Sequence, residues 1–356
     1  MNKKILISTG GSGGHVIPAT IFYEHLKDNF DVYLSTDERG LKFLNKEKYK
    51  FQIINTPKLS KNLFLLPFQI FLILYLIIKS FLFLKKKKID ILISKGGYMS
   101  LRLCLASKIL KIKILLFEPN MVLGRGNRLF LNFCKKIICY SDSIKNFPNK
   151  LKNKIVLTKT LLRKEFYSIK TNNLEKKEIN LLIIGGSQGA KLFDTIVKDS
   201  IINLSKRYDI KTFQQTSIKN YDNLKNFYKN HSVKNELFDF NENVFKFMNK
   251  INICITRAGA STLGELTFLN IPYIAIPLPN SKDNHQFENA SFYEKLGCNW
   301  LLNQNELNER VLTNKLIDVI ENTNENLEKK NNMKNFSYQN TWNNINQKII
   351  TIINEN

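Results

Sequence analysis

Two glycine-rich turns constrain the fold of this chain more than any other feature. A short apolar stretch at residues 3–9 runs into the glycine turn 10–15 (GGSGGH), and another at residues 178–184 runs into the turn 185–190 (GGSQGA). An amphipathic helical pattern follows each turn. A buried strand that feeds a glycine turn and then a helix opens a βαβ unit, which requires a parallel sheet. The repeat therefore predicts an α/β protein with two Rossmann-like, doubly wound domains.

Shorter patterns extend each half of the chain. Residues 31–36 read as the second strand of the first half, and residues 251–256 and 272–278 flank another turn and helix in the second. The helix after the glycine turn 10–15 is expected to begin near Pro18, since proline suits a first helical turn. The polar segment 168–178 reads as an exposed linker. We therefore predict domains at residues 1–165 and 166–337, followed by a C-terminal helix at about 338–356.

The composition limits the classes of partner and compartment. The 54 Lys and Arg residues outnumber the 30 Asp and Glu residues, which gives a formal charge of +24. Such a charge attracts polyanions, or it reflects a general bias toward Lys and Asn. No nucleic-acid-binding motif accompanies it, so no nucleic-acid partner is predicted. The five cysteines are scattered without CxxC spacing, which argues against zinc and disulfides and favours a reducing cytosol.

The glycine turns predict phosphate binding. Free backbone N–H groups and the helix dipole suit an anion at a helix N-terminus, although tight strand–helix packing would select the same glycines. Neither turn matches GxGxxG with a following acidic residue, and no GKS or GKT is present. Hydride-transfer cofactors and Walker-type nucleotide hydrolysis are therefore disfavoured.

A collinear set of motifs over residues 3–300 resembles the MurG family of bacterial glycosyltransferases. The motifs are GGSGGHVIPA (10–19), GGY (96–98), EPN (118–120), GRGNR (124–128), GGSQGA (185–190), RAGASTLGE (257–265) and DNHQFENA (283–290). Three places depart from the family pattern. Phe117 stands where the family usually has His, and His285 stands before Gln286 where the family has a second Gln. The domain junction reads Thr160-Leu161-Leu162-Arg163 where the family has Gly-Asn-Pro-Val-Arg.

This resemblance implies a GT-B architecture, with two Rossmann-like domains around an inter-domain cleft. The N-terminal domain would bind the acceptor and associate with the membrane, the C-terminal domain would bind the UDP-sugar, and the last helix would pack back on the first domain. The implied reaction transfers N-acetylglucosamine from UDP-GlcNAc to the C4 hydroxyl of undecaprenyl-diphospho-N-acetylmuramoyl-pentapeptide in peptidoglycan synthesis. The enzyme would be peripheral, at the cytoplasmic face of the inner membrane. The chain has no Asp-x-Asp, in agreement with a reaction that needs neither metal nor cofactor.

The resemblance also assigns roles in donor binding. Ser187 and its glycines would bind the diphosphate, Glu265 the ribose hydroxyls, Gln286 the sugar hydroxyls and Asn241 the uracil, while Arg163 resembles a uridine-binding position. For Ser187 the alternative is a plain N-cap, and for Glu265 it is an exposed helix glutamate. The remaining predicted donor-site residues are Ser12, Gly13, Gly14, Asn120, Ala260, Ser261, Thr262, Leu263 and Gly264.

Two residues are candidates for the catalytic base. His15 ends the first glycine turn, and an imidazole with an ordinary pKa of about 6.5 suits proton abstraction near neutrality. Glu118 is the rival base, although it could instead be a buried hydrogen-bonding carboxylate. One base and direct displacement suffice for an inverting reaction, so an α-linked donor is expected to give a β-linked product.

Residues 63–84 form the most apolar stretch, and Lys85–Lys88 follow it. Its length qualifies as a membrane span. A single crossing would, however, put the first glycine turn and the turn at 96–98 on opposite sides of the bilayer, although one sheet needs both strands. A helix in the membrane interface fits better, and a buried core helix is the alternative.

Three other functions compete with this interpretation. A GT-B transferase could use a UDP-sugar on a different lipid such as diacylglycerol, and a UDP-GlcNAc 2-epimerase shares the architecture. A membrane-bound polyanion-binding protein would account for the charge alone. The apolar helix argues against the soluble epimerase, and acceptor-dependent release of UDP distinguishes all three.

Overall fold

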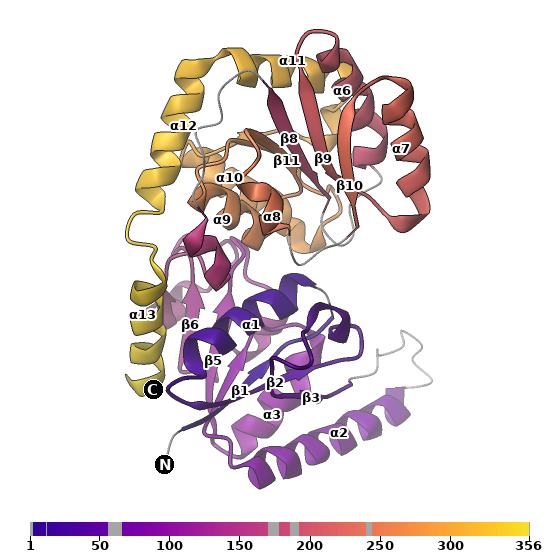
Figure 1. Ribbon diagram of the computed structural model, residues 1–356. Helices are drawn as coiled ribbons and strands as arrows, with labels where there is room; N and C mark the ends of the chain where they lie inside the picture. The colour runs from indigo at the N-terminus through magenta and orange to yellow at the C-terminus, as the bar shows by residue number, and fades with distance from the viewer. Residues whose placement is uncertain are drawn as a thin grey trace. The chain divides into compact units, whose positions relative to one another are not determined.

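The chain forms two compact α/β units. The computed structural model describes residues 3–11, 13–55, 66–169, 178–185, 192–239 and 244–355. Met1–Leu161 and Thr341–Asn356 make up the first unit, and Leu162–Asn340 the second. Each unit is built around one parallel sheet flanked by helices (Figure 1). The predicted fold class of two Rossmann-like domains is confirmed.

The first unit has the strand order β3-β2-β1-β4-β5-β6-β7 among the described residues. Its strands are β1 (Lys4–Ser8), β2 (Asp31–Thr36), β3 (Phe51–Ile53), β4 (Ile91–Ser94), β5 (Lys113–Glu118), β6 (Lys136–Cys139) and β7 (Ile155–Leu157). Its α-helices are α1 (Gly13–Leu26), α2 (Leu66–Lys87), α3 (Leu101–Ile109), α4 (Arg125–Phe130) and α13 (Trp342–Glu355). The order reverses between β1 and β4, and ligands of such sheets bind beyond the strand carboxyl ends at this point.

The second unit repeats the plan with the order β10-β9-β8-β11-β12-β13. Its strands are β8 (Ile179–Ile184), β9 (Ile210–Gln215), β10 (Lys234–Phe238), β11 (Ile253–Thr256), β12 (Tyr273–Ala275) and β13 (Trp300–Leu301). Its described α-helices are α6 (Lys198–Ser205), α7 (Tyr221–Asn230), α8 (Phe245–Met248), α9 (Ala260–Phe268), α10 (His285–Lys295), α11 (Glu309–Glu321) and α12 (Thr323–Phe336). Here the order reverses between β8 and β11. Most of the predicted linker, residues 170–177, lies outside the described residues.

Continuous apolar runs become strands because both faces of each sheet are covered. Ile5, Leu6 and Ile7 of β1 are all buried, and Leu6 lies in register with Leu92 of β4. A half-solvated strand would alternate polar and apolar residues, whereas β1 does not. The predicted strands at 3–9, 31–36, 178–184, 251–256 and 272–278 are therefore confirmed.

Helix α1 begins earlier than the sequence predicts. It starts at Gly13, so Pro18 lies inside the helix instead of in its first turn. Proline has no N–H and cannot donate to the carbonyl four residues earlier, which is that of Gly14. The side chain of Lys95, which follows β4, donates to this carbonyl oxygen. A distant lysine thus supplies the hydrogen bond that Pro18 cannot.

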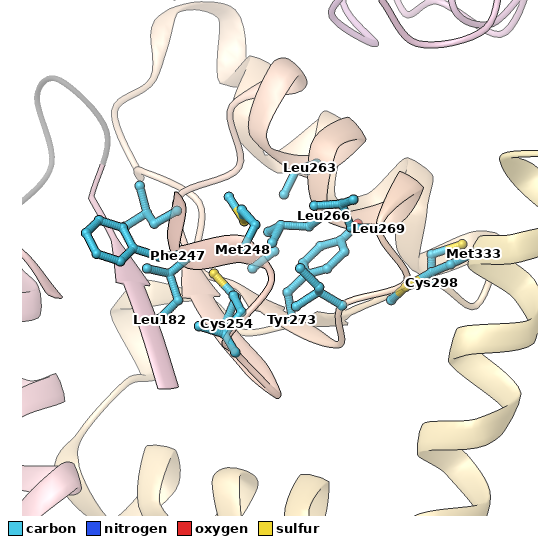
Figure 2. Packing of buried hydrophobic residues seen from close by; sticks show 14 of the residues in the cluster. Leu182, Phe247, Met248, Cys254, Leu263, Leu266, Leu269, Tyr273, Cys298 and Met333 are labelled. Carbon is cyan, nitrogen blue, oxygen red and sulfur yellow. The ribbon is translucent and has the colours of Figure 1, made fainter. Parts of the chain in front are cut away.

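A dense apolar cluster joins the sheet of the second unit to α9. Leu263, Leu266 and Leu269 point from the α9 segment toward Tyr273 of β12, and Met333 of α12 closes one side (Figure 2). All five side chains are at most 3% exposed. Burial of this helix face fixes the direction in which the polar start of α9 projects.

Helix α13 returns from the end of the chain to the first unit and runs beside α1 (Figure 1). The Trp342 indole stacks on the His25 imidazole, with ring centroids 3.7 Å apart, and His25 Nδ1 lies 3.3 Å from Asn346 Oδ1. Lys3 Nζ donates to the Ile353 carbonyl at 2.8 Å. Both chain ends therefore stabilise the same unit.

Among the described residues, one helix is long and apolar enough to cross a membrane: α2, over Phe68–Lys87. It packs along α3 at the outside of the first unit (Figure 1). Much of its apolar surface stays exposed, as with Phe71 at 70% and Phe68 at 67%. Helix α2 is therefore not a buried core helix.

We predict that protonation of His25 weakens the fold in acid. Burial lowers the pKa of His25 to about 4, below its ordinary 6.5, although the bond to Asn346 opposes the shift. The folded state binds this proton less well than the unfolded chain does. The contribution of neutral His25 to the free energy of unfolding is therefore complete above pH 6.5 and is lost as the pH falls toward 4. Linkage puts it at about 3 kcal/mol. Urea denaturation from pH 7 to 4 should show this slope, and His25→Phe, which keeps a ring beside Trp342, should flatten it. An unchanged slope would contradict the prediction.

Candidate functional site

Three turns meet at the carboxyl edge of the first sheet. They follow β1, β4 and β5, and the last two approach each other so closely that only glycines fit. A Cβ on Gly126 would lie 2.4 Å from Gly97 N, and Gly97 has a φ of +80°. The loop after β4 and the start of α4 therefore touch backbone to backbone.

His15 is the third residue of α1, in the helix turn whose N–H groups have no carbonyl partners within the helix. Its imidazole is partly exposed and faces the loop after β4, because a Cβ on Gly97 would lie 3.7 Å from His15 Cε1. The residues Gly13 and Gly14 precede it in the same turn. The structure thus brings the predicted base to the switch point of the sheet.

Asp37 holds the first glycine turn in place. Its carboxylate accepts from the Gly11 N–H at 2.7 Å and the Gly40 N–H at 3.0 Å, and Arg39 Nε donates to its other oxygen at 2.7 Å. Burial works against ionisation, but these donors lower the pKa of Asp37 overall. The sequence interpretation missed this residue, which only the parallel pairing of β1 with β2 brings near the turn.

Glu118 ends β5 with both carboxylate oxygens engaged. Oε1 accepts from Asn120 N at 3.2 Å and Asn120 Nδ2 at 2.9 Å, while Oε2 accepts from Gly124 N at 2.8 Å and Asn127 Nδ2 at 2.9 Å. Burial raises the pKa of the carboxyl, and the four donors oppose that rise. A proton on either oxygen would displace one of these bonds. We infer that Glu118 organises the loop carrying Asn120 and that it is poorly placed as the catalytic base.

The second unit presents the start of α9. Gly259 caps the helix with extended backbone, and the partly exposed residues Ala260, Ser261 and Thr262 form its first turn. Leu263 and Gly264 are buried, with the Leu263 side chain in the core. Any ligand contact of Leu263 is thus limited to its backbone. The N–H groups of this turn are free of helix partners and suit an anion.

Glu265 and Arg163 come together although 102 residues separate them. Arg163 Nη2 lies 3.5 Å from Glu265 Oε1, and its guanidinium lies over the rings of Phe166 and Phe245. Burial raises the pKa of Glu265, and the nearby Arg163 opposes the rise. Glu265 is 6% exposed, so the exposed-glutamate reading of this residue is wrong. A buried carboxylate beside a guanidinium can receive hydroxyl donors from a ligand.

Gln286 lies where the loop after β12 enters α10. Its Oε1 accepts from the Leu278 N–H at 3.0 Å, and its own N–H donates to Ser281 Oγ at 3.3 Å. One turn later, Asn289 Nδ2 donates to the Ala258 carbonyl at 3.1 Å, which joins α10 to the turn before α9. Arg257, at the end of β11, donates to the carbonyls of Ile276 and Pro277. The loops after β11 and β12 therefore form one braced surface.

Three predicted donor-site residues, Ser12, Ser187 and Asn241, lie outside the described residues. The remaining predicted site residues, catalytic and donor-binding, fall into two groups. His15, Gly13, Gly14, Glu118 and Asn120 lie at the carboxyl edge of the first sheet, and Arg163, Ala260–Glu265 and Gln286 lie in the second unit.

The two units match two consecutive domains of one enzyme family. Residues 5–139 match the glycosyltransferase family 28 N-terminal domain, and residues 180–345 match the family 28 C-terminal domain. The chain belongs to glycosyltransferase family 28. The resemblance to the MurG family, first seen in the motifs, is confirmed for both halves of this family 28 chain.

Curated relatives of this family 28 chain match it over all or most of its length. It is 61% identical over 356 residues to the UDP-N-acetylglucosamine–N-acetylmuramyl-(pentapeptide) pyrophosphoryl-undecaprenol N-acetylglucosamine transferase of Pelagibacter ubique, with 100% of both chains covered. The protein of the same name from Rickettsia bellii is 34% identical over 343 residues, with 92% of this chain and 95% of the relative covered.

Solved structures agree on the fold. The crystal structure of Acinetobacter baumannii MurG matches with a TM-score of 0.77 at 22% identity, over 99% of this chain and 100% of that one. UDP-GlcNAc 2-epimerase from Neisseria meningitidis, bound to UDP-GlcNAc, matches with a TM-score of 0.71 at 15% identity, over 99% and 100%. At such identities the structures support the GT-B fold alone, and the fold does not separate a transferase from an epimerase.

We predict that Glu118→Gln destabilises the family 28 chain. An amide keeps one acceptor oxygen and turns an NH2 group toward two of the four donors, so buried N–H groups lose their partners. The free energy of unfolding should fall by about 1–3 kcal/mol in urea denaturation. Glu47→Gln, at an exposed position of the same unit, should leave it unchanged. Full stability with activity abolished would instead identify Glu118 as the base.

The Arg163–Glu265 pair gives a second stability prediction. Arg163→Met should destabilise the chain by about 3 kcal/mol, because it leaves a buried carboxylate without its cation. Adding Glu265→Leu should recover most of the loss, since the double variant buries no charge. Urea denaturation of the two single variants and the double variant measures this coupling, and strictly additive losses would show that the residues do not interact.

Proposed function

We propose that this chain transfers N-acetylglucosamine from UDP-N-acetylglucosamine to the C4 hydroxyl of undecaprenyl-diphospho-N-acetylmuramoyl-pentapeptide. The product is the lipid-linked disaccharide of peptidoglycan synthesis, so cell wall formation, cell shape and division depend on it. The observation that carries the proposal is the 61% identity to the Pelagibacter transferase, over the full length of both chains. Two separate observations support it: His15 lies at the carboxyl edge of the first sheet, and Glu265 lies near the start of α9 in the second unit.

The proposed donor site lies in the second unit. The N–H groups at the start of α9 and the turn containing Ser187 would neutralise the leaving diphosphate, as helix N-termini do for anions. Glu265 would accept hydrogen bonds from the ribose hydroxyls, and Arg163 would hold the uridine beside Glu265. Gln286 would contact the sugar. Asn241 is assigned to the uracil by family resemblance.

The proposed acceptor site lies in the first unit, with His15 as the general base. His15 would take the proton from the C4 hydroxyl as the oxygen attacks the anomeric carbon and the bond to UDP breaks. In this site Glu118 holds Asn120 and its loop, and Asn120 positions substrate. A single displacement inverts the anomeric centre, so the α-linked donor gives a β-linked product.

An assay of UDP release tests the proposed function. Release from UDP-N-acetylglucosamine is expected only when the muramyl lipid is added, and the anomeric coupling in the product's NMR spectrum should be that of a β-linkage. Release driven equally well by diacylglycerol would favour a transferase for another lipid. Conversion of the donor to its 2-epimer without any acceptor would identify an epimerase, and an α-linked product would overturn direct displacement.

We predict that His15→Ala lowers kcat by about 10²–10⁴-fold, the usual contribution of a positioned general base. The KM for UDP-N-acetylglucosamine should change little, because His15 lies in the first unit. His231→Ala removes an exposed imidazole in the second unit and serves as the matched control. An activity loss below tenfold for His15→Ala would remove His15 from the role of base.

We also propose that α2 binds the cytoplasmic face of the membrane without crossing it. Helix α2 lies in the chain between β3 and β4, which belong to one sheet, and a single crossing would put these two strands on opposite sides of the bilayer. Among the side chains of α2 that the structure describes, the exposed large apolar ones are Phe68, Ile70, Phe71, Leu74, Tyr75, Ile78 and Leu82. Lys85–Lys87 end the helix and Lys88 follows it, where cations attract anionic lipid. We assign the basic charge of this region to lipid and propose no nucleic-acid partner.

Flotation with anionic vesicles tests the membrane proposal. Changing Lys85–Lys88 to Gln should weaken binding and its salt dependence, since each lysine contributes roughly 1 kcal/mol near an anionic surface. Phe71→Ser with Leu74→Ser should weaken binding at any salt concentration. Ile218→Ser, which removes a 78% exposed apolar side chain from the second unit, is the control. Unchanged binding of both α2 variants would contradict the proposal.

A further inference from the structure

Lys95 is a site residue that the motifs did not single out. It follows β4 directly and precedes Gly96 and Gly97, so it lies in the loop that touches His15 and the start of α4. The side chain is partly buried and donates to the Gly14 carbonyl in the first turn of α1. Its ammonium is therefore held at the positive end of a helix, where a second positive charge is unfavourable without an anion.

The surrounding protein leaves most of this ammonium's bonding capacity unused. An ammonium has three donors, and the Gly14 carbonyl takes one. Among the described residues, Lys95 has neither another hydrogen-bond acceptor nor a salt-bridge partner. Glu118 is the carboxylate whose charge acts on it, but the Glu118 oxygens are engaged by Asn120, Gly124 and Asn127. A partly buried cation in this state is matched to an anionic ligand.

We propose that Lys95 binds a phosphate of the lipid-linked acceptor at the carboxyl edge of the first sheet. The inference rests on the proposed function, whose acceptor carries a diphosphate. The N–H groups of the first turn of α1 lie beside Lys95 and add donors for the same group. The hydrogen bond to Gly14 orients the side chain, because Pro18 leaves that carbonyl without its helical donor.

The charge of Lys95 makes this recognition depend on pH. Burial lowers the pKa of Lys95 to about 7, although Glu118 works against the shift. The other ionisable groups around this loop are His15 of α1, the Asp37–Arg39 pair, whose Arg39 Nη2 contacts Met99 Sδ, the buried Arg102 of α3, and the exposed Arg125 and Arg128 of α4. As the pH rises through 7, Lys95 of the free enzyme loses a proton and with it its positive charge. The kcat/KM for the acceptor should therefore fall on the alkaline side, since this quantity reports the free enzyme.

Two variants separate recognition from a structural role. Lys95→Gln keeps a neutral donor for the Gly14 carbonyl but removes the charge, and should raise the acceptor KM by about tenfold or more at pH 6.5. Its KM for UDP-N-acetylglucosamine should stay within about twofold. Lys95→Arg stays charged at every accessible pH, so it should keep a low acceptor KM and abolish the alkaline decline of kcat/KM. Inorganic diphosphate should compete with the acceptor, and less strongly in the Gln variant.

The outcomes are distinct. A raised KM for the donor in place of the acceptor would assign Lys95 to the UDP diphosphate and overturn the proposal. An acceptor KM and alkaline limb that match the wild type in both variants would also overturn it and leave Lys95 a partner of Gly14 alone. If Lys95→Gln does not fold, the pH profile of Lys95→Arg decides, and a retained alkaline limb counts against the proposal. If the wild-type protein transfers no sugar, the proposed function itself is wrong.

Discussion

A parallel sheet sends the carboxyl end of every strand to one edge, and the chemistry of this protein depends on that constraint. In the first unit it brings together the turns after β1, β4 and β5, which contribute His15, Lys95 and Glu118. Glycine makes the meeting possible, since Gly97 and Gly126 pack with their backbones in contact. Any side chain at Gly126 would push the loop after β4 away from the start of α4, and so move Lys95 relative to Glu118.

The sequence was sufficient for the fold but not for the pairing of residues in the site. The parallel plan and the strands that were predicted follow from apolar runs and glycine turns, which are local signals. The contact of Arg163 with Glu265 depends instead on how the segment before β8 packs on α9, and no local pattern encodes this. The role of Asp37 could not be predicted for the same reason. An aspartate after a strand is common, and its contact with Gly11 exists only because β2 pairs with β1.

Lys95 and Pro18 show how a local rule can be correct and still mislead. Proline favours a first helical turn, so the helix was expected to open there, yet α1 starts five residues earlier. The tertiary structure compensates by filling the vacant bond to Gly14 from Lys95. A lysine after a strand carries no signal of its own. Its relevance appears only when the carbonyl that it contacts, and the engaged state of Glu118, are known together.

The return of α13 to the first unit has a consequence for how the protein is made. Its buried residues Ile345, Ile349, Ile352 and Ile353 complete a unit whose other residues end at Leu161. During synthesis the first unit emerges early but waits for the last helix before its surface beside α1 is covered. The second unit has every residue it needs before the chain is finished. The unit made first is therefore the one completed last, and a ribosome that stops at residue 340 releases a chain whose second unit is whole and whose first is not.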